Sequence, residues 1–567
     1  MTAAGRSASR LLFPPLAWLR GYTSGTAVAD LVAGLTLAAY AVPVALAYAT
    51  LAGMPPQVGV YGYMLGGLGY ALLGTSRHLA VGPTSAISLM VAANVAVMAG
   101  GDPARYAAIA TLAGFAVALL CAIAWALRLS ALVKLISDSV LVGFKAGAGI
   151  TIGLTQVPAL LGVPGGGQNV AARVIHLVEQ LPQTNGVTLA LGLVALGLLV
   201  AGGRLLPGKP VALGVVVLSI LAVVLFGLSG HGVAVTGTVP SGLPALGLPT
   251  LRLSEAEGIF PLAAGCLLLA YIEGVSAARG FAEKHGYALD TRQEFLGIGA
   301  ANLLAALGHG YPVAGGLSQS AVSEKAGSRT PLALVFASAT LALALLFLTG
   351  PLASLPKAVL AAVVLTAVSG LIDITALRRL WRVNRPDFAA ALVALFAVLL
   401  LGVLQGILFA ALATILMLLV AAARPHVAFL GRIPGREGFS DMTRHPENLP
   451  IPGVLAFRPE AALIYVNAET VMHAVLDRLV AEPEGRVRLV VCDLSASPRI
   501  DLAAAGMLGK LQAQLSARGI RLAVVGAHGR VRDLLRRDGL ADLVGGIARE
   551  VTLASVISEI ASAAETE

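Results

Sequence analysis

The chain has 567 residues, of which 57% are hydrophobic and only 12% are charged. A soluble protein has roughly 25% charged residues, so this composition excludes the soluble globular, disordered and fibrous classes. The formal net charge of +9 does not indicate a nucleic-acid-binding protein, because the Lys and Arg residues lie mainly in short gaps between apolar runs. That distribution is typical of membrane proteins.

The N-terminal segment, residues 1–25, contains Arg6, Arg10 and Arg20 but no apolar core followed by a cleavage site. We therefore predict no secretory signal peptide. The first long apolar run begins near Val28, and we expect it to direct membrane insertion itself. The N-terminal segment is then expected to stay in the cytoplasm.

Apolar runs long enough to cross a lipid bilayer follow one another through residues 26–424, which we expect to form a transmembrane transport domain. A helix needs roughly 20 apolar residues to cross the bilayer. The expected spans are 27–50, 57–74, 105–127, 136–161, 187–203, 210–228, 258–281, 294–308, 331–349, 353–373, 387–403 and 405–423. Two further apolar stretches, Val81–Ala99 and Pro312–Val322, bring the expected number of segments to fourteen.

The distribution of basic residues predicts the orientation of these segments. With the N-terminus inside the cell, the connections that face outward hold only Arg105, Arg173, Arg252 and Lys357, and the other basic residues of the connections face inward. This asymmetry is the positive-inside bias. We expect a multi-pass protein of the cell's inner (plasma) membrane with both termini in the cytoplasm.

The two additional stretches differ from ordinary spans, since one begins at Gly82-Pro83 and the other contains Pro312, Gly315 and Gly316. Each is the third segment in its set of seven. Short, Gly- or Pro-interrupted segments at matched positions of two halves indicate a transporter binding site. A half-helix that begins inside the membrane presents free N–H groups and the positive end of its dipole, and both attract anions.

The residues at the start of the two half-helices are the candidate anion ligands. They are Thr84 and Ser85 in one segment, and Ser318, Gln319 and Ser320 in the other. Their side chains can donate hydrogen bonds to an oxyanion. The alternative is that these glycines and prolines are ordinary kinks and that the hydroxyl groups bond back to their own helices.

Glu273 lies deep in an apolar run, where a carboxyl group is energetically costly and is usually functional. A group that can be protonated there is suited to proton coupling. The alternative is a structural ion pair with Arg279 or Lys145. Lys145 also lies within an apolar run, and we expect it to be paired or to extend toward the membrane surface rather than to bind the anion.

After Arg424 the composition changes to that of a soluble domain. We expect a Pro-rich linker at 425–452 and a small α/β domain at 453–567, because strand-like and helix-like patterns alternate there. The expected strands are Gly453–Phe457, Ala462–Val466, Val487–Leu494 and Ile520–Val525, and the expected helices are Ala468–Ala481, Leu502–Arg518 and Val531–Asp538.

Nothing in the chain points to catalysis. The histidines have no metal-ligand spacing, and the stretch Gly162–Gly167 lacks the Gly-Lys-Ser/Thr ending of a P-loop. The sequence predicts no enzyme, no cofactor and no metal site. Cys121, Cys266 and Cys492 are expected to be buried, reduced thiols.

Several stretches together resemble the SulP sulfate permease, or solute carrier 26, family of anion transporters. They are Pro43–Pro56, Gly74–His78, Gly82-Pro83, Pro240–Pro244, Lys284–Tyr287, Gln293-Glu294, Ser318–Val322 and Ala326–Pro331. The resemblance implies fourteen segments in a seven-plus-seven inverted repeat, divided into a core and a gate domain. It places the anion between the N-termini of the third and tenth segments, adds Tyr48 and Val44 to the site, and makes Glu273 the coupling residue.

Two departures from the family pattern affect the site. Many members have Arg where this chain has Gln319, so the expected site is less positive. Sodium-coupled bicarbonate members have Asp and a Thr one turn later, where this chain has Glu273 and Ala277. That difference favours protons over sodium ions as the coupling ion.

The C-terminal domain resembles a STAS domain. The matching stretches are Tyr465–Ala468, Val491–Leu494, Ile500-Asp501 and Gly519–Leu522. The resemblance implies a Ser that is phosphorylated two residues after the Asp, but Ala503 stands there. We expect this domain to serve dimer assembly and regulation, and the protein to be a homodimer.

The resulting functional expectation is a secondary active, proton-coupled transporter of a small inorganic anion, with sulfate as the first choice, that works by alternating access. Bicarbonate or C4-dicarboxylate transport and anion exchange are the alternatives. A membrane sensor that signals through the STAS domain is the alternative from a different functional class.

Overall fold

The computed structural model describes residues 18–130, 137–167, 169–206, 210–238, 240–248, 256–483 and 485–564. The expected N-terminal segment lies outside these ranges except for residues 18–25. The chain divides into two compact units, Met1–Thr414 and Ile415–Glu567, and each is described by itself.

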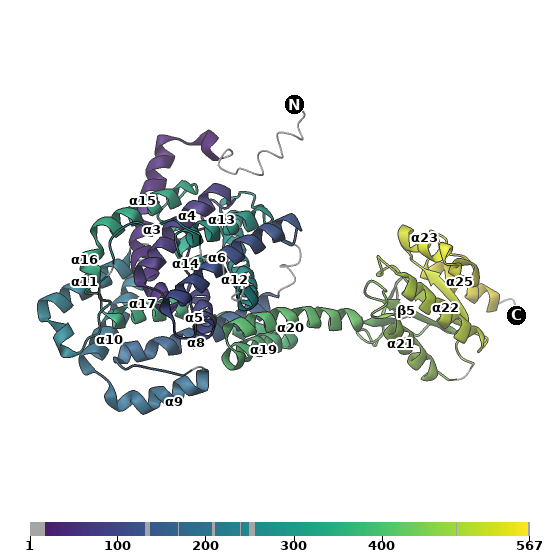
Figure 1. Ribbon diagram of the computed structural model, residues 1–567. Coiled ribbons are helices and arrows are strands. Elements are labelled where there is room, and N and C mark those ends of the chain that lie inside the picture. Colours follow the sequence, from purple (N-terminus) through teal and green to yellow (C-terminus); the bar gives the residue numbers. More distant parts are fainter. Residues whose placement is uncertain are drawn as a thin grey trace. The chain divides into compact units, whose positions relative to one another are not determined.

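The first unit is a bundle of helices (Figure 1). Its first half contains α3 (Ser24–Leu51), α4 (Pro56–Leu73), the short strand β1 (Val81–Gly82), α5 (Ser85–Ala99), α6 (Pro103–Ala126), α8 (Asp138–Leu161), α10 (Gly186–Leu205) and α11 (Val211–Phe226). Its second half contains α12 (Ala256–His285), α13 (Gln293–Leu307), the short strand β2 (Ala314–Gly315), α14 (Leu317–Lys325), α15 (Leu332–Phe347), α17 (Lys357–Ser369), α19 (Arg385–Leu401) and the beginning of α20 (Val403–Ala423), a helix that continues past Thr414 into the second unit. These helices coincide with the expected segments.

Shorter elements connect the main helices. They are η1 (Leu19–Gly21), α9 (Val170–Gln180), η2 (Leu181–Gln183), η3 (Leu228–His231), α16 (Thr349–Leu352) and α18 (Ile374–Val383). Among the described residues, seven helices are long and apolar enough to cross a membrane, and four shorter helices are also apolar. The protein is therefore a multi-pass membrane protein.

The helix contacts repeat between the two halves. Helix α6 packs on α13 and α12, and the equivalent helix of the second half, α15, packs on α4 and α3. Helix α8 corresponds to α17 of the second half, and α10 corresponds to α19. Helix α8 packs on α19, and its counterpart α17 packs in the same way on α10. Replacing each helix by its counterpart in the other half therefore turns one contact of a pair into the other contact of that pair, as expected for the inverted repeat.

The same contacts separate two groups of helices. Helices α3, α4, α6, α12, α13 and α15 pack on one another, and α5 and α14 pack against this group. Helices α8, α10, α17 and α19 form the second group. We call them the core and the gate, the division that the family resemblance implied.

Glycine allows the closest helix crossing in the gate. A Cβ atom placed on Gly143 of α8 would lie 1.8 Å from the carbonyl oxygen of Ala391 on α19. Small residues let membrane helices approach in this way, and the tight packing supplies much of their association energy.

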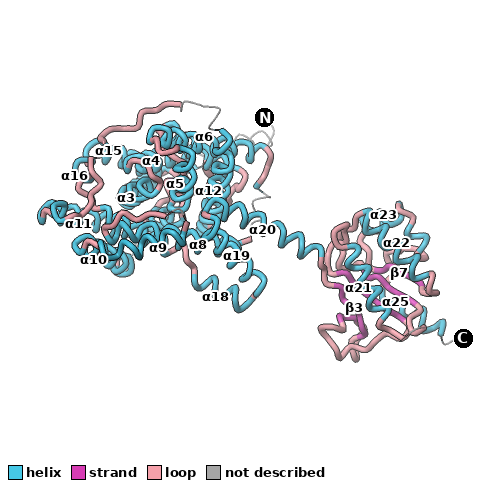
Figure 2. The backbone as a smooth tube through the Cα atoms, turned by 60° about the horizontal axis from the view of Figure 1, so that its bottom comes forward, coloured by secondary structure: helices cyan, strands magenta, loops and turns pink. Residues whose placement is uncertain are grey.

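The second unit contains a five-stranded sheet in the order β4-β3-β5-β6-β7. Its strands are drawn in magenta in Figure 2. The strands are β3 (Val427–Arg432), β4 (Phe439–Asp441), β5 (Val454–Pro459), β6 (Leu489–Asp493) and β7 (Arg521–Val525). Strand β3 is antiparallel to β4 and β5, whereas β5, β6 and β7 are parallel. The helices are α21 (Ala468–Val480), α22 (Leu502–Ser516), α23 (Gly529–Arg537), α24 (Leu540–Leu543) and α25 (Leu553–Ala564).

The two faces of this sheet are both covered. Val490 and Cys492 of β6 belong to the apolar cluster shared with α21, α22, α23 and α24. The alternate residues Leu489 and Val491 belong to a second cluster that includes Val556 of α25. This alternation is the period of two of a strand buried on both faces. Cys492 is a buried free thiol, as are Cys121 and Cys266 in the first unit, as predicted.

Two of the predictions for the C-terminal region were wrong. Part of the supposed linker, residues 427–441, forms β3 and β4 of the sheet. The two strands are short and lie between Pro and Gly residues, so their alternation was weak. The supposed strand Ala462–Val466 is instead a loop with one bridge from Leu463 to Ile500. The Asn467 amide closes this loop, because it donates to the carbonyl oxygen of Ala462 and accepts from the N–H of Ile464.

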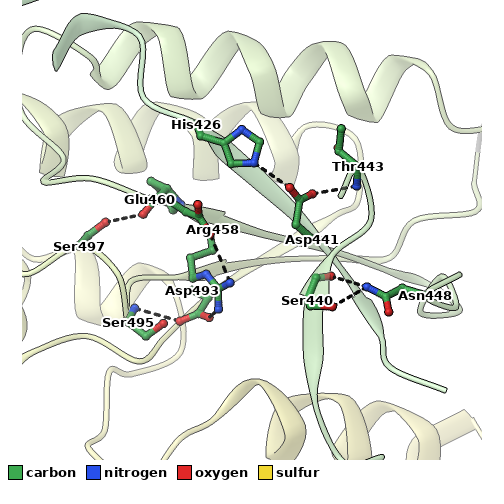
Figure 3. Close-up of polar contacts among 11 residues, drawn as sticks. His426, Ser440, Asp441, Thr443, Asn448, Arg458, Glu460, Asp493, Ser495 and Ser497 are labelled. Atoms are coloured by element: carbon green, nitrogen blue, oxygen red, sulfur yellow. Dashed lines mark hydrogen bonds and ion pairs between the residues drawn. The ribbon is translucent and has the colours of Figure 1, made fainter. Parts of the chain in front are cut away.

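The carboxylate of Asp441 fastens β4 to the start of β3 (Figure 3). It lies 2.7 Å from Nε2 of His426 and accepts a hydrogen bond from the N–H of Thr443 at 2.9 Å. Burial alone would raise the pKa of Asp441, but the hydrogen bonds from Thr443 and His426 and the charge of His426 hold it below its usual value.

We expect Asp441→Asn to lower the melting temperature of the soluble domain by a few degrees at pH 7. A carboxyl group with a depressed pKa stabilises the fold above its unfolded-state pKa of about 3.9, and that contribution disappears as the pH falls through the folded-state pKa. Thermal melts from pH 7 to pH 3 should therefore show a difference between the variant and the parent that narrows with falling pH. A difference that stays constant over this range would contradict the assignment.

Candidate functional site

The two half-helices meet through a pair of short strands. Strand β1 pairs antiparallel with β2, with Val81 opposite Gly315 and Gly82 opposite Ala314. Only Pro83 and Thr84 separate β1 from the start of α5, and only Gly316 separates β2 from the start of α14. Because the strands are antiparallel, the N-termini of α5 and α14 are held near one point and come from opposite halves of the chain.

Buried hydrogen bonds fix this strand pair in the core. The Asn302 amide of α13 accepts from the N–H of Val313 at 2.9 Å and donates to its carbonyl oxygen at 3.0 Å. Gly82 lies against the ring of Tyr63, and a Cβ atom there would come within 2.6 Å of that ring. The glycine in the Gly82-Pro83 pair therefore allows a close approach of the backbone to an aromatic side chain.

A cavity of about 310 Å³ lies at the N-termini of α5 and α14. Of the expected site residues, Val44, Tyr48, Thr84, Ser85, Glu273, Ser318 and Gln319 line it. The structure thus gathers residues of α3, α5, α12 and α14 around one space. Gate residues from α8 and α17, among them Lys145 and Ala367, complete the lining.

Ser320 does not line the cavity. Its hydroxyl group accepts a hydrogen bond from the N–H of Ala80 at 2.8 Å and donates one to the carbonyl oxygen of Gly316 at 2.7 Å. Ser320 is fully buried, so this hydroxyl group joins the two halves rather than facing the cavity. The sequence-based expectation that Ser320 binds the anion does not agree with this position.

Gln319 both lines the cavity and forms hydrogen bonds that join the two halves of the chain. It lines the cavity, but its amide nitrogen also donates to the carbonyl oxygens of Ala80 at 3.0 Å and Ala314 at 3.3 Å. The side chain is therefore oriented by the backbone of both short strands, so its NH₂ group is held in place by the protein.

Thr84 has the side chain best placed to donate a hydrogen bond to a ligand. It is the N-terminal capping residue of α5, but its side chain makes no capping hydrogen bond. Its Oγ1 atom is buried and has no hydrogen-bond partner among the residues that the structure describes. A buried hydroxyl group without a partner costs about 1–3 kcal/mol, so a bound anion that accepts this hydrogen bond would be stabilised.

Glu273 and Lys145 line the cavity from different groups of helices, Glu273 from α12 of the core and Lys145 from α8 of the gate. The structure describes both residues and Arg279, and it shows no ion pair between Glu273 and either cation. The alternative of a structural ion pair is therefore not supported. The carboxyl group is half-buried and open to the cavity.

Three polar residues that line the cavity were not among the sequence-based candidates: Tyr40, Ser276 and Lys284. Helical spacing could have found them. Tyr40 lies four residues before Val44, on the face that also carries Tyr48 one turn later, and Ser276 lies three residues after Glu273. Lys284 lies in the last turn of α12 and is exposed, which shows that the cavity opens toward that end of the helix.

The comparisons with known proteins agree with this architecture. Residues 28–394 match the sulfate permease family, and residues 445–555 match the STAS domain. The chain is 35% identical over 528 residues to a probable sulfate transporter of Mycobacterium tuberculosis, covering 93% of both chains. It is 30% identical to the chloroplastic sulfate transporter 4.1 of Arabidopsis thaliana, covering 94% of this chain and 80% of the plant protein.

Two solved structures share the fold. The murine solute carrier 26 member A9 anion transporter, in an inward-facing state, superposes with a TM-score of 0.86 at 21% identity, covering 99% of this chain and 95% of the murine chain. The transmembrane domain of the cyanobacterial bicarbonate transporter BicA superposes with a TM-score of 0.61 at 23% identity, covering 68% and 98% of the two chains. The fold, the cavity at the half-helices and the extended sequence similarity lead to one conclusion: this chain belongs to the sulfate permease family of anion transporters, with a C-terminal STAS domain.

Proposed function

We propose that the protein is a secondary active transporter of a small oxyanion, with sulfate as the first substrate, and that it couples uptake to protons. The observation that carries the proposal is the cavity at the N-termini of α5 and α14, which is lined both by Thr84, whose hydroxyl group has no partner among the described residues, and by the exposed residue Ser318. Helix N-termini and hydroxyl groups are the donors that an oxyanion requires. The sulfate transporters among the relatives support sulfate as the substrate.

Coupling to protons follows from the charges around the cavity. A sulfate dianion in this space would be repelled by an ionised Glu273, and repulsion between charges is strong where water is scarce. Protonation of Glu273 removes the repulsion and leaves the ammonium group of Lys145 to attract the anion. We therefore propose that one proton enters on Glu273 with each anion, and that sodium ions have no role.

Alternating access would use the boundary between core and gate. The anion ligands belong to the core, whereas Lys145 and Ala367 belong to the gate. A movement of one group against the other would close the cavity at the end near Lys284 and open it at the opposite end. We further propose that both termini face the cytoplasm, that the protein resides in the inner membrane as a homodimer without enzymatic activity, and that the cavity is open to the cytoplasm.

The direct test is uptake of labelled sulfate by liposomes that contain the purified protein, with and without an inward proton gradient. We expect uptake to depend on the gradient and to be inhibited by excess unlabelled sulfate. Stronger inhibition by bicarbonate, fumarate or chloride would assign one of these anions as the substrate instead. A protein that moves none of the four anions would contradict the proposal and favour a sensor.

We expect Thr84→Val to raise the KM for sulfate about tenfold, because a hydrogen bond to a charged ligand contributes ~1.5 kcal/mol. The measurement is initial uptake at a series of sulfate concentrations. Thr340→Val is the matched control, since its hydroxyl group on α15 donates to the carbonyl oxygen of Phe336 and does not line the cavity. Equal KM values for the two variants would remove Thr84 from the site.

A further inference from the structure

A second cavity, of about 560 Å³, lies in the gate at the end of α8 opposite to Lys145. It is formed by residues 154–167, by the loop that contains Ala234 and by the starts of α10 and α17. It shares no lining residue with the first cavity. Along α8, Lys145 and Pro158 are separated by thirteen residues, or about 20 Å of helix.

The charge around this second cavity is positive. Its described lining includes Arg173 of α9 and Lys357 at the start of α17, and it includes no Asp or Glu. Neither cation forms an ion pair with a residue that the structure describes. The Nε atom of Arg173 donates to the carbonyl oxygen of Gly167 at 3.1 Å, which orients the guanidinium group and leaves its two terminal nitrogens for a ligand.

A buried hydroxyl group without a partner also belongs to this cavity. Thr188 of α10 is only 2% exposed, it is one of the lining residues, and its Oγ1 atom has no hydrogen-bond partner in the described protein. This hydroxyl group is a separate observation from the two cations, and its O–H donor needs a hydrogen-bond acceptor. A ligand rich in oxygen atoms would satisfy it.

The glycine-rich stretch at 162–167 forms one wall and is held rigidly. The Gln180 side chain of α9 accepts from the N–H of Gly165 at 2.8 Å and donates to its carbonyl oxygen at 3.0 Å. Gly162, Gly165, Gly166 and Gly167 all have positive φ, the left-handed region that glycine adopts without strain. This wall of the cavity is therefore an ordered turn that the hydrogen bonds with Gln180 hold in place.

We propose that this cavity is a second binding site for a sulfate- or phosphate-type oxyanion, separate from the transport cavity. The guanidinium group of Arg173, the ammonium group of Lys357 and the hydroxyl group of Thr188 bind it, and charge-assisted hydrogen bonds of this kind are the strong ones. An anion there contacts α9, α10 and α17 at the same time, so it stabilises the packing of these three helices against one another. With the orientation proposed above, the site faces the outside, where the substrate arrives.

The experiment uses a single reactive thiol in the purified full-length chain. Ala234 is exposed and lines the cavity, and the three natural cysteines are buried, so Ala234→Cys provides one accessible position. Labelling by a maleimide is timed in sulfate and in gluconate at equal ionic strength. We expect labelling to slow about tenfold when the sulfate concentration is ten times its dissociation constant, and gluconate to have no effect.

Three variants in the Ala234→Cys background separate this site from the transport cavity. Arg173→Gln combined with Lys357→Gln should abolish the protection by sulfate, whereas Lys357→Arg should retain it. Thr84→Val combined with Ser318→Ala, which weakens binding in the transport cavity, should leave the protection unchanged. Protection that survives loss of both cations, or that disappears with the transport-cavity variant, would overturn the proposal.

The same assay distinguishes two sources of the anion. Protection by sulfate assigns a free anion, whereas protection only by dioctanoyl phosphatidylglycerol assigns the phosphate of a lipid headgroup to the same groups. Absence of protection by either probe would refute the site. Because labelling does not require transport, a failure of sulfate uptake would contradict the proposed function and leave this site standing.

Discussion

Replacing Glu273 with Gln is expected to abolish the stimulation of sulfate uptake by a proton gradient. With one proton carried per anion, a gradient of one pH unit contributes about 1.4 kcal/mol, or a tenfold change in accumulation, at a clamped membrane potential. Gln has nearly the same size as Glu but cannot take up a proton in this range. The variant should therefore show the same uptake with and without the gradient, while exchange of internal for external sulfate continues.

The measurement is sulfate uptake at equal membrane potential and varied external pH, for the parent and the variant side by side. Glu283→Gln is the matched control, because Glu283 lies on the same helix α12, is exposed and does not line the cavity. It should retain the full gradient effect. If proton-driven uptake persists in Glu273→Gln, a group other than Glu273 carries the proton.

The second large effect is expected from Gly143→Ala, which should prevent the gate from assembling. The added Cβ atom would lie 1.8 Å from the carbonyl oxygen of Ala391, far below the separation of about 3.5 Å at which two such atoms attract. Helices α8 and α19 would have to move apart along a close contact, and packed interiors do not absorb such a displacement. The yield of monodisperse purified protein should fall severalfold.

The same helix provides the control for this prediction. A Cβ atom on Gly153 would meet nothing nearer than the Cδ2 atom of Leu365, at 3.8 Å, which is an ordinary contact. Gly153→Ala should therefore purify like the parent protein, with an equal or slightly higher melting temperature, since alanine is the better helix former. Similar behaviour of the two variants in size-exclusion chromatography would show that helix propensity, and not the α8–α19 contact, sets the stability.

Much of the membrane unit was predictable because the relevant physics is local. Gly82-Pro83 and the Pro312–Gly316 stretch interrupt apolar runs, and the breaks alone located the half-helices. The isolated carboxyl group of Glu273 marked the cavity for the same reason. A polar or helix-breaking residue inside a long apolar run is conspicuous, since the bilayer tolerates it only where protein or water surrounds it.

The features that sequence reasoning missed depend on distant parts of the chain. Ser320 resembled an anion ligand, but the N–H of Ala80 from the other half occupies its hydroxyl group. The short strand Val427–Arg432 had too few residues to show a period, and its pairing with β5 defines it. The tight contact of Gly143 needed the position of Ala391 on another helix. No local pattern contains this information.

The strand pair β1–β2 also constrains how the protein can be made. Ala80 and Ser320, which hydrogen-bond across it, lie 240 positions apart, so the ribosome releases the first partner long before the second exists. During that interval β1 and the start of α5 have unpaired backbone groups at membrane depth, where no water can satisfy them. The first half must therefore wait beside the insertion machinery or in a water-filled passage, and the binding site can form only after the tenth segment has been synthesised.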